Sequence, residues 1–196
     1  MMHPDTEVRF INEEMGYGVV ATKFIPKGTI TWVQDALDQV LTPDKVSKMH
    51  PETQKLIDKY SFRNNKGNLV LCWDLAKYVN HSFNANCLSS AYDFELAVRD
   101  IHPGEQLTDD YGYLNISEPF RANDEGTDRN TVYPDDLLRY HAEWDSLLSE
   151  AFQVFDEVSQ PLSVFVPNGT LNLVRTRLRE NVPQESILNL YYRENN

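Results

Sequence analysis

Turn-forming residues divide the first 116 of the 196 residues into short segments. This spacing of turns limits the possible folds more than any other feature of the sequence. Pro26-Lys27-Gly28 and His102-Pro103-Gly104 are typical of turns. The runs between them are rich in β-branched and aromatic residues, which favour strands. Many short strands with few helices indicate an α+β, mainly β fold. Strands are predicted at residues 7–11, 18–25, 29–33, 68–73, 88–98 (with a bend at Tyr92-Asp93) and 105–111.

Two regions have the patterns of helices. Thr42-Pro43-Asp44 is typical of a helix start, with Thr42 as the cap and Pro43 in the first turn. Pro51 is expected to divide this first helical region, which ends near Tyr60. The second helix is predicted from Pro134 to Phe152, where apolar residues recur at helical spacing with acidic residues between them. Those apolar residues are Leu137, Leu138, Tyr140, Trp144, Leu147, Leu148 and Phe152.

The composition changes near Ser117. Residues 117–160 contain 11 acidic and 3 basic residues. We therefore divide the chain into residues 1–116, which carry the strand pattern, and an acidic, helical extension of residues 117–196 that packs on them. The residues after 160 show no clear pattern, although Val174 and Leu178 would share one helical face.

Charge and composition limit the partners. The formal net charge of −12 argues against direct contact with duplex nucleic acid. The charge would attract a basic peptide, but it is also explained by solubility alone, so it does not choose a substrate. No apolar run reaches the roughly 20 residues of a membrane span, and the first residues lack the pattern of a signal peptide. Cys72 and Cys87 form no close cluster, which argues against a disulfide framework and a cysteine zinc site. We expect a soluble, cytoplasmic protein that does not associate with membranes.

Three short segments contain residue types that support chemistry. They are Gly16-Tyr17-Gly18, Asn80-His81-Ser82 and the run from Gly104 to Tyr111. Taken singly, each has an ordinary structural explanation as a turn, a satisfied histidine or a core tyrosine. His81 and Ser82 suggest a base and a nucleophile, but neighbouring residues of a strand point to opposite faces, and no nucleophile elbow surrounds Ser82. A hydrolase is therefore a poor interpretation.

In their order and context, the three segments resemble SET domains. The family's opening, a GxG followed by a strand and a PKG turn, resembles GYGVVATKFIPKGT. The family's [RK]-[FY]-x-N-H-S-C-x-P-N-C segment resembles KYVNHSFNANC, and its A-x-R-x-I-x-x-G-E-E-L-x-x-D-Y ending resembles ELAVRDIHPGEQLTDDYGY. The three occur in family order over residues 8–113. By this resemblance the chain is identified as a small, stand-alone, bacterial-type member of the SET-domain protein-lysine methyltransferases.

The resemblance implies a fold and an activity. Residues 1–116 would form a SET domain of small curved sheets, in which the segments of Asn80 and Tyr111 cross in a knot-like arrangement. The cofactor would be S-adenosyl-L-methionine, and the methyl group would go to a lysine side chain of a protein or peptide substrate. The net charge of the chain suits a basic substrate.

The resemblance also implies roles for individual residues. The side chain of Asn80 would bind the methionine end of the cofactor, and the backbone of His81 would meet the adenine. Tyr111 matches the catalytic tyrosine of the family. The full set of predicted cofactor-binding residues is Gly16, Tyr17, Gly18, Asn80, His81 and Tyr111.

The proposed chemistry places demands on the site. A lysine has a pKa of about 10.4 in solution and must lose a proton before it can attack the methyl carbon. A nearby sulfonium cation and burial in an apolar channel both lower that pKa. The Tyr111 hydroxyl can position the methyl group and favour a polar transition state. An aromatic channel suits the lysine stem. Candidates to line it, each also explained as plain core, are Tyr60, Phe62, Tyr78 and Tyr113.

The sequence departs from the family pattern in two stretches around these motifs. Phe83 and Ala85 stand where many members have Cys and Pro. Residues 120–130 contain none of the cysteines of the family's C-x-C-x4-C zinc segment. Since structural zinc needs four ligands, we expect no metal site. The predicted helix with Trp144 is expected to close the site by packing instead.

A third departure is Asp109, two residues before Tyr111, where many members have Phe or Tyr whose bulk helps set how many methyl groups are added. A carboxylate beside the substrate lysine would raise the pKa of its ammonium group and oppose catalysis. Asp109 therefore points away, binds a substrate group or accompanies an unusual activity. This residue and the missing cysteines leave a second function open, a SET-scaffold module with weak catalysis that binds the cofactor or a basic peptide.

Overall fold

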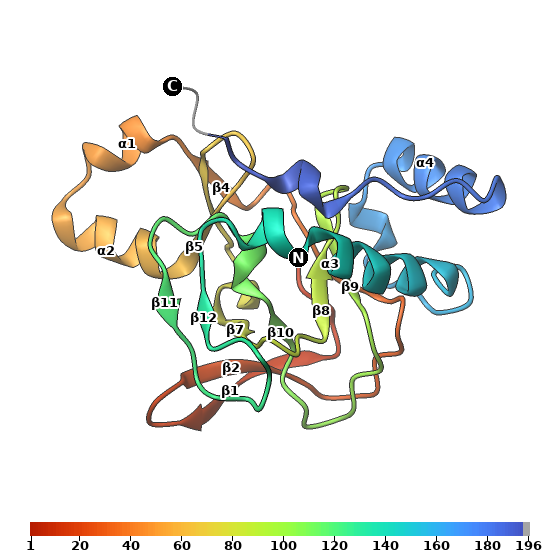
Figure 1. Ribbon diagram of the computed structural model, residues 1–196, viewed down its shortest axis with the longest axis horizontal. Helices are drawn as coiled ribbons and strands as arrows, with labels where there is room; N and C mark the ends of the chain where they lie inside the picture. The colour runs from red at the N-terminus through yellow and green to blue at the C-terminus, as the bar shows by residue number, and fades with distance from the viewer. Residues whose placement is uncertain (194–196) are drawn as a thin grey trace.

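The strands form four small sheets in the computed structural model, which describes residues 1–193 (Figure 1). A hairpin pairs β1 (Thr6–Asn12) with β2 (Gly16–Ala21). The largest sheet has, in spatial order, β3 (Ile30–Val33), β9 (Phe94–Ala97), β8 (Cys87–Ser89), β10 (Thr108–Asp109) and β7 (Asn80–His81). The other two contain β4 (Gln39–Leu41), β6 (Leu69–Leu71) and β5 (Ser61–Arg63), and β11 (Phe120–Arg121) with β12 (Thr131–Val132). The predicted α+β, mainly β class is confirmed.

Within residues 1–193, two α-helices lie between strands β4 and β5 in the chain, and two follow the last strand. The predicted cap of the first helix is confirmed, because the Thr42 hydroxyl accepts a hydrogen bond from the Lys45 amide. Pro51 begins the second helix, as expected. The α-helices are α1 (Pro43–Ser47), α2 (Pro51–Tyr60), α3 (Asp136–Gln153) and α4 (Asn168–Arg179). Single 3-10 turns are η1 (Leu75–Tyr78), η2 (Tyr111–Tyr113), η3 (Ser163–Phe165) and η4 (Ile187–Leu190).

Several of the predicted strands are shorter than the sequence pattern indicated, among them the strand predicted at 68–73, which spans only Leu69–Leu71. The strand predicted at 18–25 ends at Ala21, and beyond it Ile25 makes only an isolated bridge. In the strand predicted at 105–111, only Thr108 and Asp109 belong to a ladder. The chain then turns because the Asp110 carboxylate accepts a hydrogen bond from the Gly112 amide. Residues 110–111 therefore have the composition of a strand but belong to a turn.

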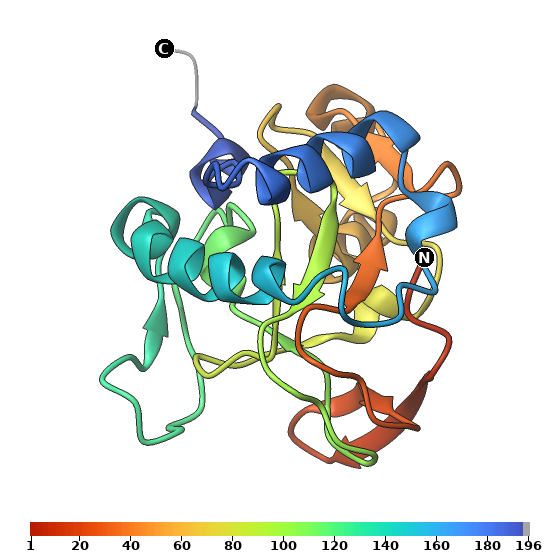
Figure 2. The same ribbon diagram turned by 90° about the vertical axis from the view of Figure 1, so that its right-hand side faces the viewer.

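The C-terminal extension shares a hydrophobic core with the largest sheet. Leu137, Trp144 and Phe152 of α3 belong to the same buried cluster as Phe94 and Leu96 of β9. Figure 2 shows α3 and α4 running along the same side of the molecule. The shared core means that the extension is packed on the strand-rich part. None of the helices among residues 1–193 combines the length and the apolarity that a membrane span needs.

The strand β10 lies between β7 and β8 and is parallel to both. Its two residues pair with the segment predicted to bind the cofactor, Thr108 with Asn80 and Asp109 with His81. This arrangement is the expected crossing of the Asn80 and Tyr111 segments. It places Tyr111, at the end of β10, beside residues that lie 30 positions earlier in the chain.

Candidate active site

The first two motif segments meet at the side chain of Asn80. Its amide nitrogen donates hydrogen bonds to the Tyr17 carbonyl over 3.2 Å and to Gln106 Oε1 over 3.0 Å. Gly18 lies directly against these groups, since a Cβ there would collide with the side chains of both Asn80 and Gln106. A side chain at this position would push apart the Asn80 and Gln106 side chains, so glycine allows the close approach of β2 and β7. A Cβ on Gly16, which has a φ of +75°, would face open space.

The second and third segments meet at His81. The backbone amide of Tyr111 donates a hydrogen bond of 3.1 Å to His81 Nδ1, and the two rings lie 5.4 Å apart. Burial lowers the pKa of His81, which favours a neutral ring. Because Nδ1 accepts, the ring proton resides on Nε2. Nε2 is buried and has no hydrogen-bond partner among residues 1–193, so this site holds one unused donor.

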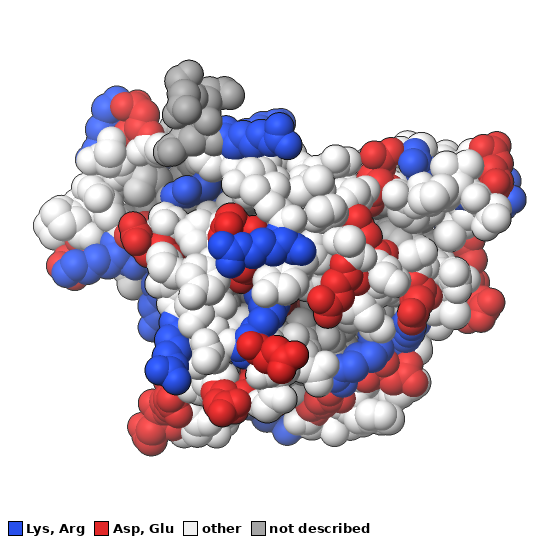
Figure 3. All heavy atoms as spheres, in the orientation of Figure 1, with Lys and Arg blue, Asp and Glu red and all other residues white. Residues whose placement is uncertain are grey.

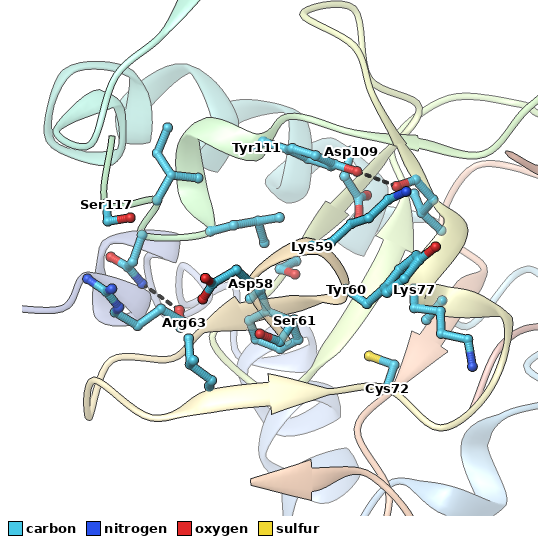
Figure 4. Close-up of a pocket in the computed structure, with 18 of the residues that line it drawn as sticks. Asp58, Lys59, Tyr60, Ser61, Arg63, Cys72, Lys77, Asp109, Tyr111 and Ser117 are labelled. Carbon is cyan, nitrogen blue, oxygen red and sulfur yellow. Dashed lines mark hydrogen bonds between the residues drawn. The ribbon is translucent and has the colours of Figure 1, made fainter. Parts of the chain in front are cut away.

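Tyr111 forms part of a cavity wall. Its hydroxyl donates a hydrogen bond of 2.6 Å to the Val79 carbonyl (Figure 4). Burial, together with the nearby Asp109 carboxyl group, raises the pKa of Tyr111, so the hydroxyl keeps its proton. The carbonyl contact holds the phenol ring in one orientation. A proton-bearing, oriented hydroxyl is what the predicted role of Tyr111 needs.

The cavity beside Tyr111 has a volume of about 410 Å³ and is lined by residues of several elements. Two of the predicted channel residues, Tyr60 and Phe62, line it. Tyr78 does not, but its ring packs on Tyr60 at 5.8 Å. Tyr113 lies in the core and borders a neighbouring cavity of about 300 Å³ instead. The aromatic wall thus differs from the predicted one, since Trp32 and Phe120 line the cavity and Tyr78 and Tyr113 do not.

Asp109 lines the same cavity as Tyr111, and Figure 4 shows the two side chains at one end of it. The first of the three alternatives for Asp109, that it points away, is therefore wrong. Asp109 is only 6% exposed, and burial raises its pKa to about 7. Glu95 of β9 lines the cavity as well and is 8% exposed. Burial and the Asp109 carboxyl group raise its pKa too. The cavity therefore has an acidic end.

Comparison with known families decides what this arrangement is. The family model described as SET domain matches residues 16–112, from the first glycine of the GxG to the residue after Tyr111. The chain is a SET-domain protein. Members of this family are typically methyltransferases. The matched residues contain every residue predicted to bind the cofactor.

Two further comparisons concern individual proteins. A solved structure from Plasmodium falciparum, described as a "putative histone methyltransferase", is similar at 16% identity with a TM-score of 0.42. The similarity covers 56% of this chain and 95% of that one. No curated protein sequence matches the chain.

Ser82 in this SET domain is not arranged as a nucleophile. Its hydroxyl donates a hydrogen bond of 2.8 Å to Glu125, which also accepts from the Phe83 amide. His81, the only base suggested for it, faces Tyr111 through Nδ1. Ser82 thus helps to anchor the segment around Glu125, and no Ser–His pair forms.

A partly buried arginine, which the sequence motifs did not indicate, organises the segment where many SET proteins have zinc-binding cysteines. Arg129 forms ion pairs with Asp110 and, over 2.7 Å, with Asp136, and both carboxylates are 1% exposed. The guanidinium carbon also lies 4.2 Å from the ring centre of Tyr140 and 4.6 Å from that of Phe83. The only sequence signal for this role is an isolated basic residue in an acidic stretch.

This Arg129 cluster fixes the β11–β12 segment next to the motif residues. Phe120 of β11 lies 5.6 Å from the ring of His81 and 6.2 Å from that of Tyr111. Trp144 of α3, expected from the sequence to help close the site, lies 5.9 Å from the Arg129 guanidinium. The extension therefore covers one side of the SET motifs with aromatic rings.

No group of three or more His, Cys, Asp and Glu side chains in the described part of the chain is placed to hold a metal ion. Cys72 and Cys87 are free and buried, and burial raises the pKa of both thiols. The absence of a bound metal stays a prediction, which metal analysis of the purified protein tests.

Proposed function

We propose that the protein transfers a methyl group from S-adenosyl-L-methionine to a lysine side chain of a protein substrate. The observation that carries the proposal is the contact of three SET segments with one another, the last of which contributes Tyr111 to a cavity wall. Asn80 bonds to the Tyr17 carbonyl, His81 accepts from the Tyr111 amide, and Tyr111 lines the cavity. Residues that lie up to 94 positions apart thus form one site whose parts match the family's cofactor and catalytic segments.

The residues present fit the cofactor. Gly16 leaves open space where a side chain would stand, and His81 Nε2 is a buried donor that has no partner in residues 1–193. Tyr17, which follows Gly16 in the chain, is exposed. Gly16, Tyr17, Gly18, Asn80 and His81 would hold S-adenosylmethionine, which when bound supplies an electrophilic methyl carbon on a cationic sulfur.

The protein's own groups would orient the reacting atoms. Tyr111 keeps its hydroxyl proton, and the contact with Val79 fixes the ring. A fixed polar group of this kind stabilises charge as it moves in the transition state. Tyr60 and Phe62 offer apolar surface to the stem of the entering side chain, and Phe120 limits the access of water to Tyr111.

A basic protein or peptide suits the charge of this chain. The net charge is −12, and the described basic side chains are interspersed with acidic ones on the face in Figure 3. Such a surface attracts cationic chains and repels phosphate backbones. We therefore propose a basic protein substrate without direct nucleic-acid contact, and a cytoplasmic location.

Transfer of a labelled methyl group to a cell lysate tests the proposal. Label should enter proteins, and mass spectrometry should find it on lysine. Asn80→Ala should weaken the binding of S-adenosylmethionine in calorimetry because it removes the hydrogen bond from β7 to Tyr17 of β2 and the hydrogen bond to Gln106. Asn84→Ala is the matched control, since Asn84 lies in the same segment with an exposed side chain.

The second function, a binding module with weak catalysis, is favoured by one observation: the acidic end of the cavity beside Tyr111. Cofactor binding without any label transfer would support this module over the enzyme. No cofactor binding by the wild-type protein would contradict both.

A further inference from the structure

The acidic end of the cavity is formed by two carboxyl groups from neighbouring parts of the largest sheet. Asp109 of β10 and Glu95 of β9 lie on either side of β8, which pairs with both strands. Glu95 accepts a hydrogen bond of 3.3 Å from the Ser89 hydroxyl. Asp109 Oδ1 is buried and has no hydrogen-bond partner in residues 1–193. One buried acceptor that lines the cavity is thus unused.

Among residues 1–193, the groups that shift the pKa of Asp109 are Tyr113, Glu95 and Asp110, and none of them is a cation. Glu95 is influenced by Asp109, by the Ser89 hydroxyl and, as the smallest contribution, by the N-terminal ammonium group. The basic side chains of the cavity wall rest on aromatic rings instead. The distances from charge to ring centre are 5.1 Å for Lys59 on Tyr60, 5.6 Å for Lys77 on Tyr78 and 5.6 Å for Arg63 on Tyr192.

A buried carboxylate without a cationic partner is unfavourable, and an occupant that supplies a positive charge and N–H donors reduces the cost. An ammonium group supplies a positive charge and N–H donors, whereas a trimethylammonium group supplies only the charge. The aromatic surface of Tyr60 and Phe62 in the same cavity suits the apolar stem that carries such a group.

We propose that Asp109, with Glu95 beside it, binds the ammonium group of a lysine-type side chain and requires N–H bonds on that group. The inference rests on the proposed function for the identity of the occupant. It assigns Asp109 to substrate recognition, the second of the alternatives that the sequence left open. Because the Asp109 carboxylate needs N–H donors, the acidic end of the cavity should bind a trimethylated ammonium group less tightly than an unmethylated one.

Three small probes test this with the full chain. They are n-butylammonium, N,N,N-trimethylbutylammonium and n-butanol. The binding of each probe is measured by NMR titration, from the shifts of backbone amides around the cavity. n-Butylammonium should bind the wild-type protein most tightly. Asp109→Asn should weaken n-butylammonium about tenfold or more, because a hydrogen bond between two charged groups is lost. The same change should leave n-butanol binding unaltered.

Two more variants and the pH dependence sharpen the test. Glu118→Gln is the matched control, because it removes a carboxylate that lines the same cavity but is exposed. It should bind n-butylammonium like the wild type. Glu95→Gln should reduce the affinity for n-butylammonium less than Asp109→Asn does. It also provides a second variant at a buried carboxyl group. Wild-type affinity should rise between about pH 6 and pH 8 as Asp109 ionises, and it should be flat in Asp109→Asn.

Equal n-butylammonium affinity in wild type and in a folded Asp109→Asn would overturn the inference, as would equal binding of the trimethyl probe. These outcomes are separate from a failure of the proposed function. Cation binding at Asp109 without label transfer from S-adenosylmethionine would contradict the enzyme alone. Label transfer with unchanged cation binding in Asp109→Asn would contradict this inference alone.

Discussion

The most informative single residue is Tyr111, because its hydroxyl and backbone amide make separate contacts. The amide donates to His81 and the hydroxyl to the Val79 carbonyl. The position of Tyr111 next to Asn80 and His81 was predictable, since the motif order requires it. The contact with Val79 was not, because it depends on how β10 inserts between β7 and β8.

Tyr111→Phe separates a catalytic from a structural hydroxyl. The ring and its packing should remain, and cofactor affinity should change little. Loss of the polar group should lower the rate of methyl transfer about 100- to 1000-fold. The effect should appear in turnover rather than in substrate affinity. Single-turnover transfer at saturating cofactor measures it.

Tyr133→Phe is the control for this experiment, because Tyr133 is exposed and distant in sequence from the motifs. It should transfer methyl groups at the wild-type rate. A Tyr111→Phe variant as fast as its parent would leave only the Val79 hydrogen bond, whose loss costs about 0.5–1.5 kcal/mol of stability.

Asp109 also makes stability depend on pH. Its pKa is raised to about 7 in the folded chain, above the roughly 3.9 of an unfolded one. The folded state therefore holds a proton that the unfolded state has released, and stability falls as pH rises from about 4 to 7. Asp109→Asn should be more stable than wild type at pH 8, by a few kcal/mol at most, and the gap should close toward pH 5. Urea unfolding at several pH values measures it, and parallel curves for the two proteins would contradict the raised pKa.

At the scale of elements, the β11–β12 segment is the least predictable part of the site. Its central cluster joins Arg129 to Asp110, 19 positions earlier, and to Phe83, 46 positions earlier. No local pattern encodes such a contact. The first two helices, by contrast, begin where Thr42 and Pro51 predict, because capping and proline geometry act within one turn.

Arg129→Met should destabilise the protein by about 3 kcal/mol or more, since it leaves two buried carboxylates uncompensated. Thermal unfolding measures the change. Arg139→Met is the matched control, because Arg139 pairs with Asp135 at the surface and should have little effect. Neutralising Asp110 and Asp136 together with Arg129→Met should recover part of the loss. A melting temperature as high as that of the control variant would show that the cluster contributes little.

At the scale of the molecule, the sequence predicted two parts, residues 1–116 and 117–196, but it did not predict how closely they are joined. Phe152 of α3 lies 6.2 Å from Phe94 of β9, ring to ring, in one buried cluster. Amphipathic spacing shows which face of a helix is buried, but not against which strand. The boundary near Ser117 is thus a change in composition across a continuous core.

Phe152→Ala should therefore destabilise both parts together. A fully buried phenylalanine reduced to alanine costs about 3–5 kcal/mol. Val164→Ala, at a side chain that is 80% exposed, should cost almost nothing. Hydrogen exchange should show the amides of β9 and α3 losing protection to the same extent. Loss confined to α3 would indicate two independent folding units.

The Arg129 cluster has a consequence for the conditions in which this SET domain stays closed. Its segment is held by ion pairs and stacked rings, and the two cysteines of the chain are buried apart from it. Chelators remove a metal from thiolates and oxidants convert thiolates to disulfides, but neither reagent attacks a guanidinium–carboxylate pair. We therefore expect closure of this site to be insensitive to chelators and to the redox state of its surroundings.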